Sequence, residues 1–229
     1  MTEMTSQSNN KGFFITGTDT EIGKTFVTGS IGHTLHQANI AATPRKPVAS
    51  GCITQADGSL ISEDALFLQS SFKTPDSLEQ ICPYLFEQAV SPKLAMELNN
   101  SPLSISDLAV NCRITNNDDI VFVEGAGGFY SPLAMDGLNA DLAVMLGHPV
   151  ILVVGDRLGC INHALLTIEA IQNRGLKLAA VVINQLHPSK QFTQGLENLV
   201  SVPIFSCPHS ESGKPATLPN ELVELLVSA

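Results

Sequence analysis

Short runs of almost continuously apolar residues, rich in β-branched and aromatic side chains, recur along the chain. Strands buried on both faces lose the alternation of polar and apolar residues that half-exposed strands show. These runs therefore predict parallel strands covered by helices. The predicted strands lie at Phe13–Thr16, Ile40–Thr43, Ile120–Val123, Val150–Val154, Ala179–Ile183 and Val202–Phe205.

Segments with helix-compatible patterns separate several of these strands. Alternating strands and helices form right-handed βαβ units, so we expect an α/β fold whose parallel sheet carries helices on both faces. Weaker periodicity between Ser70 and Asn117 predicts short helices, and leucine and valine at helical spacing predict a packing helix at Leu218–Val227. The other predicted helices are Lys24–Gln37, Asn139–Leu146, Asn162–Asn173 and Gln191–Leu199.

Composition narrows the class of protein. The 229 residues have room for one α/β domain, which we place at residues 12–229 after a polar leader at residues 1–11. The formal net charge is −10 and no lysine or arginine run occurs, which argues against nucleic acid or an anionic membrane as a partner. The apolar runs are too short to span a bilayer. Five scattered cysteines, never spaced as Cys-x-x-Cys, argue against disulfides or a zinc site and suit a reducing cytoplasm, where we expect the protein.

The segment Gly17–Thr25 joins the first predicted strand to the first predicted helix. At such a junction, unpaired backbone N–H groups and the positive end of the helix dipole converge on an anion. Gly23 lets the backbone approach phosphates, Lys24 supplies a positive charge, and the Thr25 hydroxyl can ligate Mg²⁺. The first glycine stands one position before the place that the strict phosphate-loop pattern requires. The segment therefore indicates a variant nucleotide-binding loop.

Three further positions carry charges that suit phosphate chemistry. Lys46 follows the second predicted strand, and Pro47 disfavours helix there, so the lysine is expected to extend from the strand end. Ser62 predicts a helix N-cap, and Asp64 in the first turn could complete the oxygen ligands of a magnesium ion. Glu124 ends an apolar strand, where a buried carboxylate is costly unless it meets a cation.

Four motifs, in this order, resemble the dethiobiotin synthetase family, and the resemblance runs from about Gly12 to Pro208. It implies a P-loop NTPase-like fold and an ATP-dependent ligase of biotin biosynthesis. In that family, 7,8-diaminopelargonate takes up CO₂ as a carbamate, ATP converts it to a carbamic–phosphoric anhydride, and ring closure gives dethiobiotin. The motifs are Gly17–Thr25 (Gly-Thr-Asp-Thr-Glu-Ile-Gly-Lys-Thr), Lys46–Gly51 (Lys-Pro-Val-Ala-Ser-Gly), Val123–Gly128 (Val-Glu-Gly-Ala-Gly-Gly) and Leu158–His163 (Leu-Gly-Cys-Ile-Asn-His).

The resemblance also implies roles for individual residues. Lys24 and Lys46 would be the catalytic cations, and Thr25, Asp64 and Glu124 would ligate Mg²⁺. The family resemblance implies a homodimer, in which the helix that starts near Gly159 binds the substrate carboxylate of the other subunit's site. The implied ATP-binding residues are Glu21, Ile22, Gly23, Lys24, Thr25, Phe26, Asp64, Glu124, Gly125, Ala126, Gly127, Asn184, Gln185 and Pro208. The implied substrate-binding residues are Thr20, Ser50, Leu158, Gly159, Cys160, Ile161 and Asn162.

Some positions depart from the family pattern. The usual Asn-Asp on the adenine side is Asn184-Gln185 here, which loses a carboxylate and bears on the selectivity for ATP; the later loop around Pro208 also fits poorly. Arg157 stands where lysine is common and keeps the positive charge. Cys160, with the nearby His163, suggests thiol catalysis, but the family's reaction has no thiol step, so we expect both residues to pack or cap the helix.

Two other classes of protein share parts of this pattern. Switch ATPases that position cargo often carry an extra lysine near the start of the loop. Residues 18–22 contain none, and the Lys46–Gly51 motif has no role in those proteins. Amidotransferase-type synthetases of cobalamin biosynthesis append a glutaminase domain, for which 229 residues leave no room. The sequence favours the ATP-dependent ligase over both.

Overall fold

A computed structural model describes residues 11–114 and 119–228, so the predicted leader falls outside the described residues apart from Lys11. At its centre six parallel strands lie in the order β12-β11-β10-β1-β7-β2. The predicted parallel α/β fold is confirmed. The strands are β1 (Gly12–Gly17), β2 (Ala42–Arg45), β7 (Ile120–Gly128), β10 (Val150–Gly155), β11 (Leu178–Asn184) and β12 (Ile204–Cys207).

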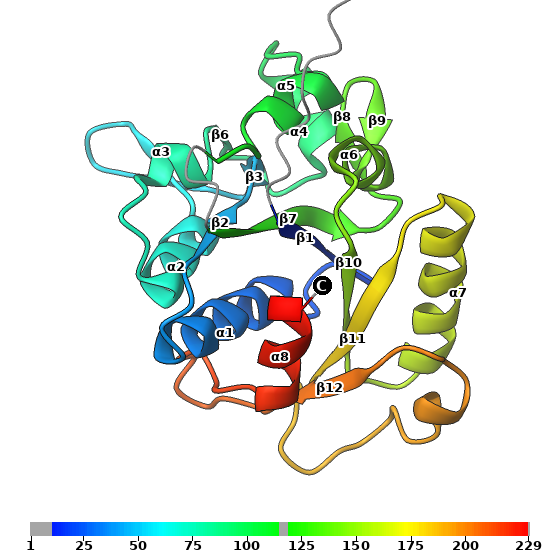
Figure 1. Cartoon of the computed structure of the whole chain (residues 1–229). Coiled ribbons are helices and arrows are strands. Elements are labelled where there is room, and N and C mark those ends of the chain that lie inside the picture. The colour runs from blue at the N-terminus through cyan, green and yellow to red at the C-terminus, as the bar shows by residue number, and fades with distance from the viewer. Residues whose placement is uncertain (1–10, 115–118, 229) are drawn as a thin grey trace, which may run out of the picture.

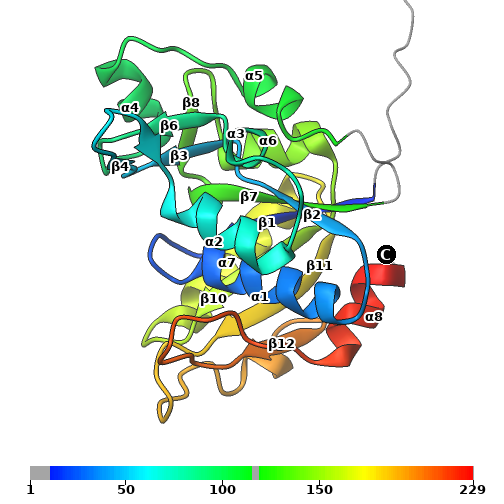
Figure 2. The ribbon, with the colours of Figure 1, turned by 90° about the vertical axis from the view of Figure 1, so that its left-hand side faces the viewer.

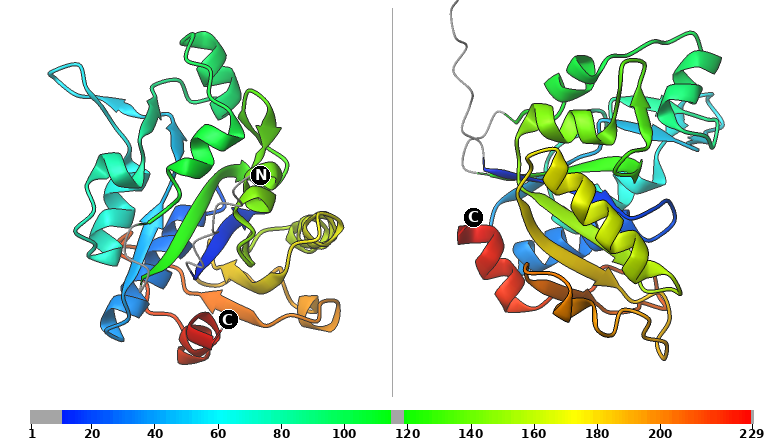
Figure 3. Two further views of the ribbon diagram at one scale, coloured as in Figure 1. Left: turned by 45° about the horizontal axis from the view of Figure 1, so that its top comes forward. Right: turned by 90° about the vertical axis from the view of Figure 1, so that its right-hand side faces the viewer.

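Helices cover both faces of this sheet (Figure 1). On one face α1 (Lys24–Gln37), α2 (Glu63–Phe72) and α8 (Asn220–Ser228) pack in a cluster that contains Phe13 and Ile15 of β1. On the other face α6 (Asn139–Leu146) and α7 (Cys160–Asn173) pack in a cluster that contains Phe14. Figure 3 shows α7 lying across its face, with α1 behind the sheet. The near-continuous apolar runs follow from this double burial.

Short elements connect β2 to β7 and β7 to β10 and form the upper part of the molecule in Figure 2. The short helices predicted for this region are present. Its strands have only two or three residues, which is too short for hydrophobic periodicity to predict them. These elements are β3 (Val48–Ser50), β4 (Ile53–Thr54), β5 (Leu60–Ile61), α3 (Leu78–Ile81), β6 (Tyr84–Phe86), α4 (Pro92–Leu98), α5 (Ile105–Val110), β8 (Pro132–Ala134) and β9 (Gly137–Leu138).

The helix predicted at Gln191–Leu199 is wrong, because that segment contains only a 3₁₀ turn, η1 (Leu196–Asn198). The backbone N–H of Phe192 donates to Asp156 Oδ1 over 2.7 Å, which ties the start of this segment to the residue after β10. Gly195 then adopts φ +94°, a left-handed conformation that interrupts a helix. The predictions for α1 and α6 are confirmed at both ends, whereas β2 and β12 each begin two residues later than predicted.

Because the central strands are parallel, the segments that follow them meet along one edge of the sheet. These segments are the loop after β1, Lys46 after β2, Asp156 to Gly159 after β10 and the residues beyond Asn184 of β11. In the described ranges no helix is long and apolar enough to cross a membrane. All five cysteines are free and buried, in agreement with the prediction against disulfides.

Candidate active site

The phosphate loop runs from the end of β1 into α1. Thr18 N donates to Val153 O (3.1 Å), which anchors the start of the loop to β10. Gly23 is the N-cap of α1 at φ +80°, and a Cβ there would lie 2.1 Å from Asn184 Nδ2. Glycine supplies no side-chain acceptor at this helix start, so the first N–H groups of α1 point toward the loop. This is the geometry that binds phosphate.

Lys24 is buried beneath this loop, and its Nζ donates to Asp19 O over 2.8 Å. Burial lowers the pKa of Lys24 to about 8, and the nearby Lys46 charge acts in the same direction, while Glu124 opposes the shift. A bound phosphate would stabilise the protonated form of Lys24, because its negative charge would offset the cost of burying the ammonium.

Glu124 organises the charged centre of the site, with 1% of its surface exposed. Its Oε1 accepts from Thr25 Oγ1 and from Lys46 Nζ, both over 2.7 Å. Its Oε2 accepts from Thr28 Oγ1 over 2.6 Å. Lys46 Nζ also contacts Asp64 Oδ2 at 2.8 Å. The structure thus brings four of the residues predicted for catalysis and metal binding into direct contact.

The sequence around Lys46 explains its placement. Its backbone N–H donates to Ile81 O (2.8 Å), and Arg45 beside it pairs with Asp76 Oδ2 (2.6 Å), so the end of β2 is fixed from both sides. Burial alone would lower the pKa of Lys46, but the negative charges of Glu124 and Asp64 outweigh burial and raise it. Lys46 therefore remains a cation at this position.

Asp64 reaches the cluster from the first turn of α2. Ser62 caps that helix by accepting from Ala65 N over 3.2 Å, so the predicted N-cap is confirmed. Burial raises the pKa of the Asp64 carboxyl, yet the charge of Lys46 and hydrogen bonds from Lys46 and Thr25 hold it below its usual value. The carboxylate is ionised where the site needs negative charge.

The donor set around Lys46 fits a magnesium ion. Two carboxylates, Asp64 and Glu124, bind the Lys46 ammonium, and the Thr25 hydroxyl donates to Glu124, so three hard oxygen donors lie together. Mg²⁺ prefers one or two protein carboxylates together with water and substrate phosphate oxygens. Within the described part of the chain no three His, Cys, Asp or Glu side chains gather as a metal site, in keeping with a set of only two carboxylates.

Glu124 lies inside β7 and not at its end, which corrects the prediction of a strand-terminal carboxylate. The strand continues through Gly125, Ala126 and Gly127 to Gly128, and Gly127 adopts φ +79°. A Cβ on Gly127 would lie 3.7 Å from Thr20 Oγ1, so this segment adjoins the phosphate loop.

The start of α7 is exposed and differs from the rest of the site. Gly159 is the helix N-cap at φ +89°, and Leu158 before it is 85% exposed. Arg157 pairs with Asp19 Oδ2 of the phosphate loop at 2.5 Å. Cys160 is buried, and burial raises the pKa of its thiol, in agreement with the prediction that it packs. Ile161 is half-buried, whereas Asn162 is exposed.

The remaining predicted residues line the edges of the loop. Asn184 Nδ2 donates to Ile22 O over 2.9 Å, so this side chain braces the phosphate loop from β11. Gln185 follows it with its N–H bonded to Cys207 O (3.0 Å), and Pro208 is exposed just after β12. Of the other predicted residues, Thr20 and Glu21 are exposed, Phe26 stacks on Phe67 with ring centroids 6.3 Å apart, and Ser50 donates to Val90 O over 2.7 Å.

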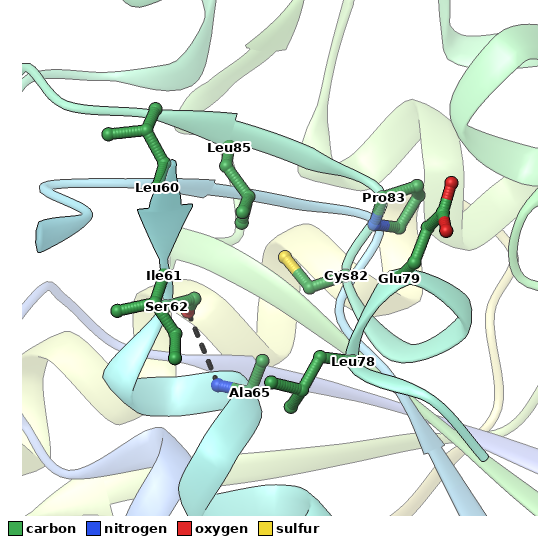
Figure 4. A pocket seen from close by; sticks show the side chains of 9 residues that line it. All are labelled: Leu60, Ile61, Ser62, Ala65, Leu78, Glu79, Cys82, Pro83 and Leu85. Carbon is green, nitrogen blue, oxygen red and sulfur yellow. Dashed lines mark hydrogen bonds between the residues drawn. The ribbon is translucent and has the colours of Figure 1, made fainter. Parts of the chain in front are cut away.

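A pocket of about 350 Å³ lies beside the Lys46 cluster, between β5, α3 and β6 (Figure 4). Its walls are mainly apolar, and burial raises the pKa of Cys82 to about 12, so that thiol is a poor nucleophile. Ser62 at its border is committed to capping α2. The lining contains none of the described residues predicted for ATP, metal or substrate. It consists of Leu60, Ile61, Ser62, Ala65, Leu78, Glu79, Cys82, Pro83 and Leu85.

Sequence reasoning missed two buried side chains of the site, Thr28 and Asn139. Thr28 lies one helical turn after Lys24, and this spacing places both on one face of α1. That spacing is a signal that could have suggested a contact with Glu124. Asn139 contacts Ala126 across 13 residues of chain, and a lone asparagine carries no pattern that predicts such a contact.

The fold and the loop define a P-loop NTPase-like protein. A family model described as an AAA domain matches residues 11–211. The solved structure of a ParA family ATPase from Chlorobium tepidum TLS superimposes with a TM-score of 0.52 at 14% identity, covering 97% of this chain and 90% of that chain. At this identity the similarity supports the fold alone.

Two curated relatives define the family more closely. The ATP-dependent dethiobiotin synthetase BioD of Pseudomonas paraeruginosa (strain DSM 24068 / PA7) is 44% identical over 192 residues, which is 83% of each chain. The protein of the same name from Cellvibrio japonicus (strain Ueda107) is 43% identical over 193 residues, 84% of this chain and 83% of that one. This chain belongs to the dethiobiotin synthetase family.

Proposed function

We propose that this chain catalyses the ATP-dependent closure of a cyclic urea: 7,8-diaminopelargonate and CO₂ give dethiobiotin while ATP becomes ADP and phosphate. The observation that carries the proposal is the contact of Thr25 and Lys46 with Glu124, and of Lys46 with Asp64, beside a phosphate loop. The names and the identity of the two relatives support the same reaction.

The reaction has three balanced steps. One substrate amine adds to CO₂ and loses a proton, giving a carbamate. A carbamate oxygen then attacks the γ-phosphorus of ATP, ADP leaves, and a carbamic–phosphoric anhydride forms. Finally the second amine attacks the carbonyl carbon and loses a proton, the bond to the phosphate oxygen breaks, and phosphate leaves as the ring closes. Phosphoryl transfer of this kind needs positioning and charge neutralisation more than covalent help from side chains.

The residues at the strand ends would supply both. The ammonium groups of Lys24 and Lys46 would neutralise the γ-phosphate and carbamate oxygens, while the loop N–H groups hold the phosphates. Thr25, Asp64 and Glu124 would hold Mg²⁺, which supplies charge neutralisation at the phosphates when bound. Thr20 and Ser50 would contact the diamine. The nucleotide would lie along the phosphate loop, the Gly125–Gly127 segment and the side of the site that contains Asn184. The residues that would contact it are 21–26, 124–127, 184, 185 and 208.

The proposal includes a homodimer in which α7 of each subunit completes the other subunit's site. The start of α7 offers the N–H groups of its first turn beyond Cys160, whose own N–H donates to Arg157 O, and the positive charge of Arg157, which pairs with Asp19 in this chain; both features suit a carboxylate. Exposed apolar side chains on and near α6 and α7 supply a surface that a second copy would cover: Tyr130, Val144, Met145, Leu158 and Leu166. We place the reaction in a reducing cytoplasm, which the five free cysteines support.

Incorporation of labelled CO₂ tests the proposed reaction. Purified protein with ATP, Mg²⁺, 7,8-diaminopelargonate and labelled bicarbonate should form labelled dethiobiotin, with one phosphate released for each ring closed. Omitting the diamine should abolish phosphate release. Steady ATP hydrolysis without the diamine, and no labelled ring, would contradict the proposal and would favour a switch ATPase.

A further inference from the structure

Strand β7 leaves the regular sheet directly after Glu124. Ile15 of β1 lies opposite Glu124, and the next aligned pair is Gly17 with Gly128, so β7 advances by four residues while β1 advances by two. On its other side β2 stops at Arg45, opposite Val123. The segment Gly125–Gly127 is therefore a bulge whose backbone groups leave the register of both neighbouring strands.

The side chain of Asn139 bonds to this bulge from the first turn of α6. Its Oδ1 accepts from Ala126 N over 3.0 Å, and its Nδ2 donates to Ala126 O over 2.5 Å and to Gly128 O over 3.0 Å. The side chain is fully buried. A carboxamide offers the same donor and acceptor as a peptide group, so Asn139 replaces the missing strand neighbour at Ala126.

The bulge is held between Asn139 and the phosphate loop. A Cβ on Gly125 would lie 2.5 Å from Asn139 Oδ1, while a Cβ on Gly128 would lie 3.7 Å from both Thr18 O and Asp19 Cα. Glycine is therefore required on the Asn139 side, because any side chain at Gly125 would displace the amide. Small shifts of the bulge would change its spacing from the loop.

We propose that Asn139 is a positioning residue: it holds the Gly125–Gly128 backbone against the phosphate loop and so fixes Glu124 relative to Thr25 and Lys46. The inference rests on the proposed function, because it assigns the bulge to the region where phosphate and carbamate meet. Asn139 itself touches no reacting group. It acts through the backbone on either side of Ala126, and a displacement of about 1 Å in such a site costs about 10²-fold in rate.

The test uses Asn139→Leu, which keeps a similar volume and removes the amide, and Asn139→Asp, which keeps only the acceptor for Ala126 N. In the leucine variant, hydrogen–deuterium exchange at Ala126 should rise about tenfold, the equivalent of one lost hydrogen bond. Turnover should fall by about 10–100-fold, with the aspartate variant between it and the wild type.

Thr34→Val is the matched control. Thr34 is also buried and its hydroxyl makes two hydrogen bonds, to Ser30 O and from Leu218 N, far along α1 from the site. It should lower the melting temperature and leave turnover unchanged. Unchanged exchange at Ala126 in Asn139→Leu, or an equal loss of turnover in Thr34→Val at matched stability, would overturn the inference. If the leucine variant fails to fold, the aspartate variant decides by the same two measurements.

The wild-type enzyme separates the two proposals. A wild type that makes no dethiobiotin would remove the proposed function. The exchange at Ala126 and the rate of ATP hydrolysis would then still be compared between wild type and Asn139→Leu. Equal exchange or equal hydrolysis would remove the inference about Asn139, whatever the second substrate is.

Discussion

The Glu124 cluster and the start of α7 both lie at the edge of the sheet where the central strands end, yet they differ in how far this chain completes them. In the cluster, Lys46 and Glu124 are nearly inaccessible, and their charges meet partners at 2.7–2.8 Å within the same chain. At the start of α7, Leu158 is 85% exposed, and a Cβ on Gly159 would meet nothing within 4 Å. One region is closed and the other is open.

This difference suits the two regions to different tasks, phosphoryl transfer among buried charges and substrate binding at an exposed helix start. Buried charges are costly unless each is paired, so a cluster such as that of Lys46 must be assembled by one folded chain before any ligand arrives. An exposed helix start with a glycine N-cap costs little free energy, because water can satisfy its N–H groups until a second surface binds there. In the proposed reaction, the closed region would therefore carry out phosphoryl transfer, and the open one would bind the far end of the substrate.

The largest expected effect is at Lys46. Lys46→Gln removes the cation between Glu124 and Asp64, and loss of one preorganised charge at a transferring phosphoryl group lowers turnover by about 10²–10³-fold. Dethiobiotin formation measures the loss, circular dichroism checks the fold, and Lys73→Gln on the surface serves as the control. Near-normal turnover would mean that the closed region is not the chemical centre.

The second effect concerns the two carboxylates. Asp64→Asn and Glu124→Gln should each lower activity at fixed Mg²⁺ by about 10²-fold, because each removes a charged oxygen ligand of the same ion. The double variant should be little worse than either single one, since the second change acts on an ion already lost. Activity measured across Mg²⁺ concentrations tests this, and multiplicative losses would assign the carboxylates to separate roles.

The residues of the closed region differ in how well the sequence predicted them. Lys46, Asp64 and Glu124 are each marked locally: a proline after the lysine, a serine N-cap before the aspartate, an apolar run before the glutamate. The parallel pairing of β2 with β7 brings Lys46 beside Glu124, and the first turn of α2 presents Asp64 to them. Nothing local marks Asn139, because its partner is a bulge formed by tertiary register. The helix predicted at Gln191–Leu199 failed at Gly195, whose φ of +94° interrupts a helix.

Strand ends were predicted less well than strand centres. Pro203 has no N–H to donate, so β12 begins only at Ile204 although Val202 is apolar. Strands of two or three residues, such as β4 and β5, are too short to show a period. The central sheet followed from sequence because its strands are long and buried on both faces.

The third effect is at Gly159, in the open region. Gly159→Ala and Gly159→Trp share the strain of φ +89°, but only tryptophan adds bulk into space that is free within one chain. If a partner subunit fills that space, Gly159→Trp should lose about tenfold more activity than Gly159→Ala, since a blocked contact costs more than local strain. Gly175→Trp, at φ +70° and also in open space, is the control.

Mixed dimers of two variants test whether the site is shared between subunits. After subunit exchange, Lys46→Gln and Gly159→Trp chains should form heterodimers with one intact composite site, regaining about half of the activity of a wild-type dimer. Each variant alone should be nearly inactive. Verified heterodimers without recovery would place the carboxylate pocket within one chain, and activity that is independent of concentration down to the monomer would reject the shared site.

The smallest effect is a pH dependence confined to the closed region. Burial lowers the pKa of Lys24 to about 8, so the free protein loses this positive charge above pH 8, and a bound phosphate favours the protonated form. ATP affinity should therefore fall by up to about tenfold from pH 7 to pH 9, with proton uptake on binding near pH 8.5. Calorimetry in buffers of different ionisation enthalpy measures that uptake. Lys24→Met should abolish it and Gly159→Trp should not, because the open region contributes no proton; binding without uptake in the wild type would show that Lys24 stays charged before the nucleotide arrives.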